Sequence, residues 1–163
     1  MAALILVVED NPDNMSLMVY LLRAHGYEPL QAVEGAEGVR VATEAQPDLI
    51  LLDLRMPEMG GYQAVDLIRD WPRLKKTRVV AVTASAMVGD KNRITAAGFD
   101  GYIRKPIAPE TFVNEIEQFV HKELRAGLGD FFVDYYIKLK QSEIDRFNSE
   151  VSDWEQREYF SLF

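Results

Sequence analysis

The sequence lacks several features on which common protein chemistries depend. It has no cysteine, which excludes disulfide bridges and thiolate metal sites, and its two histidines are too few for a histidine-built metal centre. No apolar run approaches the roughly 18–20 residues that a membrane-spanning helix needs. The Gly-x-x-x-x-Gly-Lys-Ser/Thr loop and the Gly-x-Gly-x-x-Gly turn are also absent, so the usual backbone cradle of a nucleotide site is missing.

Basic charge is scarce as well. The chain has 18 Lys and Arg against 26 Asp and Glu, and the resulting net charge of −8 argues against broad nucleic-acid binding. It opens with Met1-Ala2-Ala3 and runs directly into apolar residues, without the basic region of a secretory signal. We therefore expect a cytoplasmic protein with no membrane or nucleic-acid partner. Its 163 residues suffice for one domain with a sizeable core and an extension.

Short apolar runs alternate with stretches of helical periodicity. The pattern predicts strands near 4–8, 28–32, 48–53, 78–82 and 100–103, and helices near 12–25, 35–45, 61–70, 85–97 and 108–124. Gly26 and Gly98 end the first and fourth helices, and Pro109 is expected in the first turn of the fifth. Such alternation is typical of a doubly wound α/β fold, a parallel sheet with helices on both faces. The second strand is the most polar and is predicted at an edge.

Polar side chains follow four of the predicted strands. They are Glu9 and Asp10 after the first, Asp53 after the third, Thr83 after the fourth and Lys105 after the fifth. Parallel strands bring their carboxyl ends to one edge of the sheet, which is where such folds bind ligands. We therefore expect these side chains to form a single site.

Three carboxylates so close together are unfavourable unless a cation accompanies them. Without sulfur or histidine ligands nearby, the fitting ion is a hard one held by oxygen, and Mg²⁺ suits this best. Asp10 and Asp53 are expected to bind it directly and Glu9 through water. The main-chain carbonyl of Arg55 is expected to complete the protein ligands.

The remaining residues of this predicted site suit a phosphoryl group. Lys105 provides a cation that can pair with Asp53 at rest and with an added phosphoryl group later. The Thr83 hydroxyl can donate to a phosphoryl oxygen, and the small Ala84 beside it leaves room for that group. Pro106 would set the direction of the lysine if the bond between them is cis.

In this order, the acidic pair, the aspartate, the Thr-Ala and the Lys-Pro resemble the receiver domain of two-component response regulators. The turn Met56-Pro57-Glu58-Met59-Gly60-Gly61 after Asp53 fits the same family, and the resemblance covers about residues 3–123. It implies a flavodoxin-like fold with strand order 2-1-3-4-5. It also implies Mg²⁺-dependent phosphorylation of Asp53 by a histidine kinase or a histidine phosphotransfer protein, and signalling through protein contacts rather than enzymatic turnover.

The resemblance further implies a switch. Thr83 and Lys105 would hold the phosphoryl group, and Tyr102, three residues before Lys105, matches the switch aromatic of the family. Movement of Thr83 and Tyr102 would alter the surface formed by the fourth helix, fifth strand and fifth helix. A small Mg²⁺-dependent phosphohydrolase is an alternative, but that class places an acid two residues after its nucleophile, where this chain has Arg55.

The last part of the sequence has a different pattern. After a receiver domain at 1–125 and a glycine-containing junction at 126–129, residues 130–163 predict an amphipathic helical tail. Its heptad-like seam consists of Val133, Ile137, Lys140, Ile144, Phe147, Val151 and Trp154. The tail could pack on its own domain, form a homodimer or bind a partner helix, and in the last two cases the protein could be a switchable adaptor or dimeriser with the tail as output.

The tail also resembles, more weakly, the carboxy-terminal helix of glutamine synthetase-type enzymes. The Val-x-x-Trp-Glu-x-x-x-Tyr spacing over 151–159 carries most of this similarity. No catalytic part of such an enzyme is present, so no synthetase activity is implied. A gene fusion, an engineered junction near 126–130 or chance would each account for it.

Overall fold

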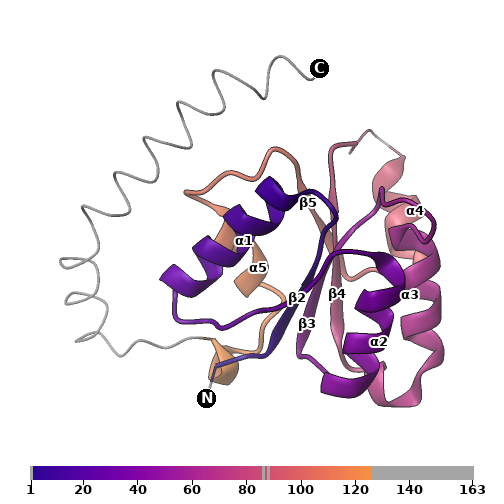
Figure 1. The fold of residues 1–163 in the computed structure, drawn as a ribbon, viewed down its shortest axis with the longest axis horizontal. Coiled ribbons are helices and arrows are strands. Elements are labelled where there is room, and N and C mark those ends of the chain that lie inside the picture. Colours follow the sequence, from indigo (N-terminus) through magenta and orange to yellow (C-terminus); the bar gives the residue numbers. More distant parts are fainter. Residues whose placement is uncertain (1, 86, 88, 126–163) are drawn as a thin grey trace. The chain divides into compact units, whose positions relative to one another are not determined.

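The computed structural model describes residues 2–85, 87 and 89–125 of the chain. These form a parallel sheet of five strands in the order β2-β1-β3-β4-β5 (Figure 1). The strands are β1 (Ile5–Val8), β2 (Leu30–Ala32), β3 (Leu49–Asp53), β4 (Arg78–Thr83) and β5 (Gly101–Arg104). The predicted fold class and strand order are confirmed, and the polar β2 lies at an edge as expected.

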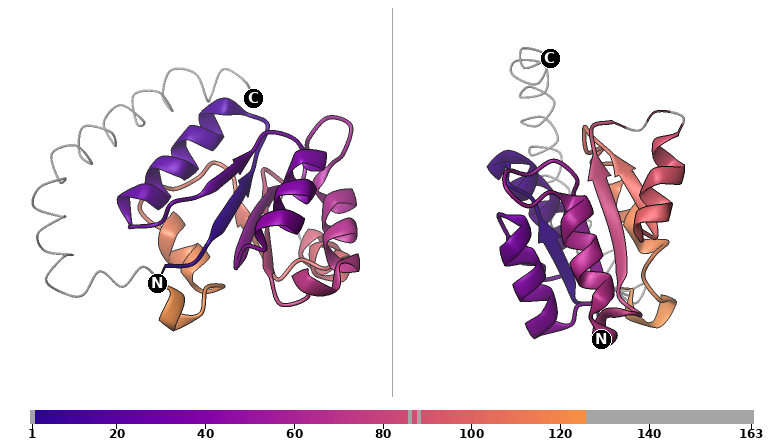
Figure 2. Two further views of the ribbon diagram at one scale, coloured as in Figure 1. Left: turned by 60° about the horizontal axis from the view of Figure 1, so that its bottom comes forward. Right: turned by 90° about the vertical axis from the view of Figure 1, so that its right-hand side faces the viewer.

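Helices cover both faces of this sheet. They are α1 (Pro12–Ala24), α2 (Gly35–Ala45), α3 (Gly61–Asp70), α4 (Asp90–Ala97) and α5 (Phe112–Glu117), with short 3₁₀ turns at η1 (Pro72–Leu74) and η2 (Lys122–Leu124). α1 and α5 pack on one face, and α2, α3 and α4 on the other (Figure 2). Among the described residues, no helix has the length and apolar character required to cross a bilayer.

The two faces of the sheet define two apolar cores. Alternate residues of β1 and β3 point to opposite sides, so that Ile5 and Leu49 join the core under α1 and α5 while Leu6 and Ile50 join the other. All nine residues of β1 and β3 are buried, which explains why these strands read as unbroken apolar runs ending in one carboxylate. The central position of both strands places their ends in the middle of one sheet edge.

The start of α4 differs from the prediction. The helix was expected from residue 85 but begins at Asp90. Thr83 and Ser85 bond to each other instead of entering a helix, and the Asp90 side chain accepts a hydrogen bond from the Met87 N–H. These local side-chain bonds compete with helix formation, as is typical of Ser, Thr and Asp.

The last helix is also shorter than predicted, since α5 spans Phe112–Glu117 rather than 108–124. Pro109 lies before the helix and not in its first turn, because the Ala108 carbonyl accepts from the Thr111 and Phe112 N–H groups in a separate turn. After Glu117, backbone hydrogen bonds between residues three positions apart replace the four-residue bonds of the α-helix. At His121, with a ψ angle of 138°, the chain leaves the helical conformation. Phe112, Ile116 and Val120, each four residues apart, are nevertheless buried.

The turns of the chain show further local features. Gly26 and Gly98 follow α1 and α4 with φ angles of 86° and 109°, a region that glycine adopts without strain. Asn11 caps α1, and its side-chain oxygen accepts from the N–H groups of Asp13 and Asn14. The peptide bond between Lys105 and Pro106 is cis. The predicted tail, its seam and the junction at 126–129 lie outside the described residues, so the domain boundary stays a prediction.

Candidate functional site

Four strand ends bring their polar residues to one edge of the sheet. β1 and β3 pair in parallel, which puts Glu9 beside the segment that ends at Asp53. β3 and β4 pair up to Asp53 and Val82, and the Lys105 N–H donates to the Thr83 carbonyl across β4 and β5. The strand order changes direction between β1 and β3, so this edge contains the switch point at which doubly wound folds bind ligands.

The three predicted carboxylates form a compact cluster. One oxygen of each of Glu9, Asp10 and Asp53 lies within 4.8 Å of the others. Glu9 is fully buried and Asp53 is 4% exposed, whereas Asp10 faces solvent. The Glu9 Oε2 atom is buried, and the described residue that lies against it is Lys105, whose Nζ is 2.9 Å away. Three clustered carboxylates, which offer oxygen donors and negative charge, fit a hard cation such as Mg²⁺.

Lys105 is the cation that the protein itself places here. Its Nζ lies 2.9 Å from Glu9 Oε2 and 3.3 Å from Asp53 Oδ2. The expected pairing with Asp53 is therefore present, but Glu9 is nearer to the ammonium group. Burial lowers the pKa of Lys105, and the two carboxylates more than offset this effect, so that its pKa lies above the usual value. The lysine is positively charged at neutral pH.

The pKa values of the two buried carboxylates are raised as well. Burial, and next the charge of Asp53, raise the pKa of Glu9 to about 7, although Lys105 works against both. Burial also raises the pKa of Asp53, against the lowering effect of Lys105 and of the Arg55 N–H, which donates to Asp53 Oδ1 over 3.1 Å. One lysine therefore does not fully compensate the buried negative charge of this site.

The hydrogen bonds of the described residues do not join every predicted residue to Asp53. The Thr83 hydroxyl is buried, but it donates to the Ser85 carbonyl over 2.9 Å and accepts from the Ser85 N–H over 3.1 Å. Ala84 is exposed beside it. Tyr102 is partly buried and lines a pocket of about 350 Å³ with Pro106 and Phe112, residues of the β5–α5 connection and of α5.

Sequence reasoning missed two residues near this site. A Cβ atom at Gly61 would lie 2.5 Å from the Asp53 carbonyl oxygen, so α3 can start this close to Asp53 only because residue 61 is glycine. The Gly60-Gly61 pair was visible in the turn, but its contact with Asp53 was not. The second is Asp90, whose carboxylate binds Ser85 and Met87 at the start of α4; no spacing in the sequence signalled it.

The fold and this edge together define a doubly wound α/β protein with an acidic, lysine-bearing site at its switch point. The family model of the response regulator receiver domain matches residues 5–117. The chain belongs to this family. It is therefore a receiver domain of the class of phosphoacceptor signalling proteins, as the sequence resemblance implied.

Individual relatives agree with this assignment. The polar-differentiation response regulator DivK of Brucella anthropi is 40% identical over 116 residues, which cover 71% of this chain and 94% of that protein. The chemotaxis protein CheY4 of Vibrio cholerae is similar in structure, with a TM-score of 0.70 and 28% identity over 74% of this chain and 100% of that one. The receiver domain of a Pseudomonas aeruginosa sensor histidine kinase has a TM-score of 0.67 and 32% identity over 73% of this chain and 98% of its own, and it holds magnesium in its active-site cleft.

Proposed function

We propose that Asp53 is the phosphoacceptor of this receiver domain and that it takes its phosphoryl group from a phosphohistidine of a kinase or phosphotransfer protein. The observation that carries the proposal is the meeting of Asp53 with Lys105 and two further carboxylates at the switch point. Its Oδ2 lies on the Lys105 side, and its Oδ1 accepts from the Arg55 N–H. A positioned carboxylate and a cation beside it are what an in-line phosphoryl transfer requires.

In the reaction, a carboxylate oxygen of Asp53 forms a bond to phosphorus as the bond from phosphorus to the histidine nitrogen breaks. The electron pair of that bond stays on the imidazole, which leaves with a proton from solvent. Lys105 is placed to shift from Asp53 to an oxygen of the new phosphoryl group. Thr83 can donate to another oxygen once it leaves Ser85, and the small Ala84 leaves space nearby.

We propose that Glu9, Asp10 and Asp53, together with the main-chain carbonyl of Arg55, hold a Mg²⁺ ion. The acidic cluster, in which Glu9 and Asp53 are buried, supports this assignment. When bound, Mg²⁺ supplies the positive charge that neutralises the developing charge on the transferred group. Lys105 alone balances only one of the three carboxylates.

For the output, we propose that Tyr102 turns inward as Thr83 moves toward the phosphoryl group. Tyr102 lies on β5 next to the pocket formed with Phe112, so its rotation alters the surface of α4, β5 and α5. A protein partner that prefers one of the two surfaces then reads the phosphorylation state. The expected cellular location is the cytoplasm, where histidine kinases present their phosphohistidine.

The test uses the full chain, Mg²⁺ and acetyl phosphate, with intact mass as the readout. One phosphoryl group should add per chain, stable in acid and labile in base, and Asp53→Asn should abolish it. Asp66→Asn, an exposed aspartate on α3, is the matched control and should be phosphorylated normally. Phosphorylation that persists in Asp53→Asn would contradict the assignment, and sustained turnover of unrelated phosphate esters would favour a phosphohydrolase.

The helical tail and its role as a dimeriser or adaptor remain a proposal about residues outside the described range. It is supported by the heptad-like seam that includes Phe147 and Trp154. Measuring the mass in solution of the full chain and of a 1–126 truncation, each with and without phosphorylation, tests it. Equal association states in all four samples would remove the dimeriser.

A further inference from the structure

The Thr83 hydroxyl has one proton to donate, and in this structure it is already used. It goes to the Ser85 carbonyl over 2.9 Å, and the Ser85 N–H donates back to the Thr83 oxygen over 3.1 Å. Because Thr83 is only 3% exposed, no solvent competes for these bonds. Donation to a phosphoryl group on Asp53 therefore requires that the Thr83–Ser85 pair separates first.

Ser85 is itself held from the start of α4. Its hydroxyl donates to Asp90 Oδ2 over 3.2 Å, and the Met87 N–H donates to the same oxygen over 2.8 Å. Asp90 is the first residue of α4 and lies after Gly89, whose φ of 119° allows the chain to turn there. A continuous path of hydrogen bonds thus joins Thr83, Ser85 and Asp90.

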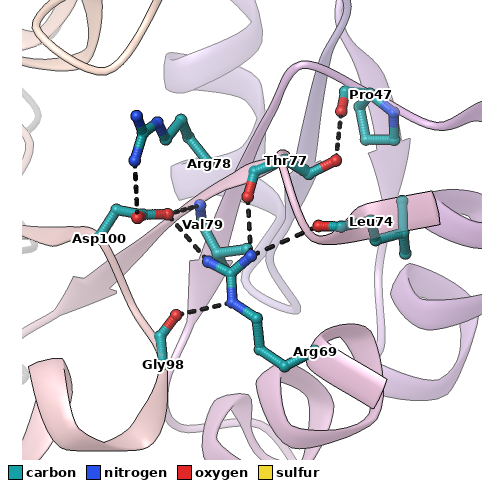
Figure 3. A network of polar contacts seen from close by, with 8 residues as sticks. All are labelled: Pro47, Arg69, Leu74, Thr77, Arg78, Val79, Gly98 and Asp100. Carbon is teal, nitrogen blue, oxygen red and sulfur yellow. Dashed lines mark hydrogen bonds and ion pairs between the residues drawn. The ribbon is translucent and has the colours of Figure 1, made fainter. Parts of the chain in front are cut away.

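The carboxy-terminal end of α4, opposite to Asp90, is held by hydrogen bonds to the rest of the domain. The Gly98 carbonyl, just past the helix, accepts from Arg69 Nε over 2.9 Å, and the same guanidinium bonds to Thr77, Leu74 and Asp100 (Figure 3). Ile94, in the middle of α4, is buried in the core below. Separation of the Thr83–Ser85 pair from Asp90 therefore acts against a helix that is held at its far end and by Ile94.

A simpler interpretation is that Asp90 only caps its own helix. The bond from the Met87 N–H serves that purpose, since a side chain near the start of a helix often reaches back to an N–H before it. The bond from the Ser85 hydroxyl does not, because it satisfies no backbone N–H. This second bond distinguishes a helix cap from a restraint on the Thr83 segment.

We propose that Asp90 is a positioning residue that, through Ser85, keeps the Thr83 hydroxyl away from Asp53 and so stabilises the resting state. The inference rests on the proposed phosphorylation of Asp53. A ligand that binds only the switched state has an apparent affinity reduced by the fraction of chains in that state. Removing the restraint raises that fraction and tightens binding of a phosphoryl analogue, without any new contact to the analogue.

The test measures the affinity of the full chain for beryllofluoride in the presence of Mg²⁺, by calorimetric titration. Asp90→Ala and Ser85→Ala should each bind about three- to tenfold tighter than the unmodified chain, which corresponds to the loss of about one net hydrogen bond. Asp90→Asn keeps an oxygen acceptor and should stay within about twofold of the original affinity. The gain in affinity of the double variant should be smaller than the product of the two single gains, because both substitutions break the same path.

Thr95→Ala is the matched control. Its hydroxyl lies on the same helix and donates to the Lys91 carbonyl over 2.9 Å, with no link to Ser85. It should leave the affinity unchanged. A pure capping role for Asp90 predicts a lower melting temperature for Asp90→Ala without tighter binding, and that result would overturn the proposal.

Ser85→Ala leaves the Met87 bond intact and decides the question alone if Asp90→Ala does not fold. Unchanged or weaker binding by a folded Ser85→Ala variant contradicts the restraint. Failure of the proposed function looks different, because the unmodified chain would then bind no beryllofluoride and accept no phosphoryl group. Binding by the unmodified chain with no gain in the variants rejects only the role of Asp90.

Discussion

The two edges of the sheet each hold a cation against acidic side chains, but they satisfy their charges to different degrees. At the amino-terminal edge, Asp100 accepts from Arg69, Arg78 and the Val79 N–H, so two cations surround one acid (Figure 3). At the carboxyl edge, Lys105 alone lies against Glu9 and Asp53, with Asp10 close by. One edge is a complete network and the other is short of positive charge.

The difference separates a structural role from a chemical one. Arg69 donates to three backbone carbonyls and to Asp100, which joins α3 to α4, β4 and β5. Such a network stabilises the fold most when all of its hydrogen bonds are kept. The carboxyl edge keeps like charges together at a cost in stability, as sites of reaction often do, and can gain favourable interactions from an added cation.

The largest loss of stability is expected from Arg69→Ala. The variant removes one of the two cations from Asp100 and leaves the Gly98 and Thr77 carbonyls without this donor, and we expect the free energy of unfolding to fall by about 3 kcal/mol. Urea denaturation measures this change. Arg73→Ala, an exposed arginine in the adjacent turn, should change stability by less than about 0.5 kcal/mol. A loss in Arg69→Ala that Mg²⁺ restores would contradict the separation of the two edges.

Lys105→Ala should produce the next largest loss, with a different dependence on conditions. Without Mg²⁺ near pH 8, two buried carboxylates lose their cation, and we expect a loss of about 2 kcal/mol. Added Mg²⁺ should recover part of it, because an ion that binds only the folded state stabilises that state. Lys91→Ala, on the exposed side of α4, is the control for removal of a lysine charge. Equal losses with and without Mg²⁺ would argue against a cation site at this edge.

Glu9 should make stability depend on pH. Its pKa is raised to about 7, first by burial and then by Asp53, from an ordinary value of 4.5. The folded state therefore binds more protons than the unfolded state between these values, so stability in the absence of Mg²⁺ should decrease as pH rises from about 4.5 to 7. The decrease should be on the order of 2 kcal/mol.

Thermal unfolding as a function of pH, with Glu9→Gln as the comparison, measures this slope. The variant should lose most of it, and the remainder should come from Asp53, whose pKa burial also raises. A slope that is unchanged in Glu9→Gln would show that the pH dependence has another source.

The smallest effect is expected at a pair that belongs to neither edge. Arg40 and Glu44 form an exposed ion pair of 3.0 Å on α2, one helical turn apart. Because the pair is exposed and has the less favourable order, with the arginine first, Glu44→Ala should cost only about 0.3 kcal/mol. Added salt should reduce the difference further. A cost comparable to that of Arg69→Ala would mean that charge removal as such, and not the network, sets these values.

The amino acid sequence determined the order of strands and helices because the apolar period is a local property. In α1, Met15, Met18, Val19 and Leu22 recur at spacings of three and four and are all buried, and in β3 the apolar run Leu49-Ile50-Leu51-Leu52 is buried on both sides. Asp53, Glu9, Asp10 and Lys105 were also identifiable, since each directly follows such a strand. Helix ends were harder at α4 and α5, where bonds of Ser85, Asp90 and Ala108 replaced expected helical turns.

The tertiary structure alone decided how these residues meet. That Glu9 is fully buried and that it lies nearer than Asp53 to Lys105 depend on the packing of the strand ends. The Arg69–Asp100 pair joins residues 31 positions apart, a distance at which no periodic pattern operates. The apolar periodicity of the sequence indicates which face of a helix or strand is buried. The pairing of charges depends instead on where other helices and strands end in space. The sequence therefore determined the members of the site, and only the folded chain determined its balance of charge.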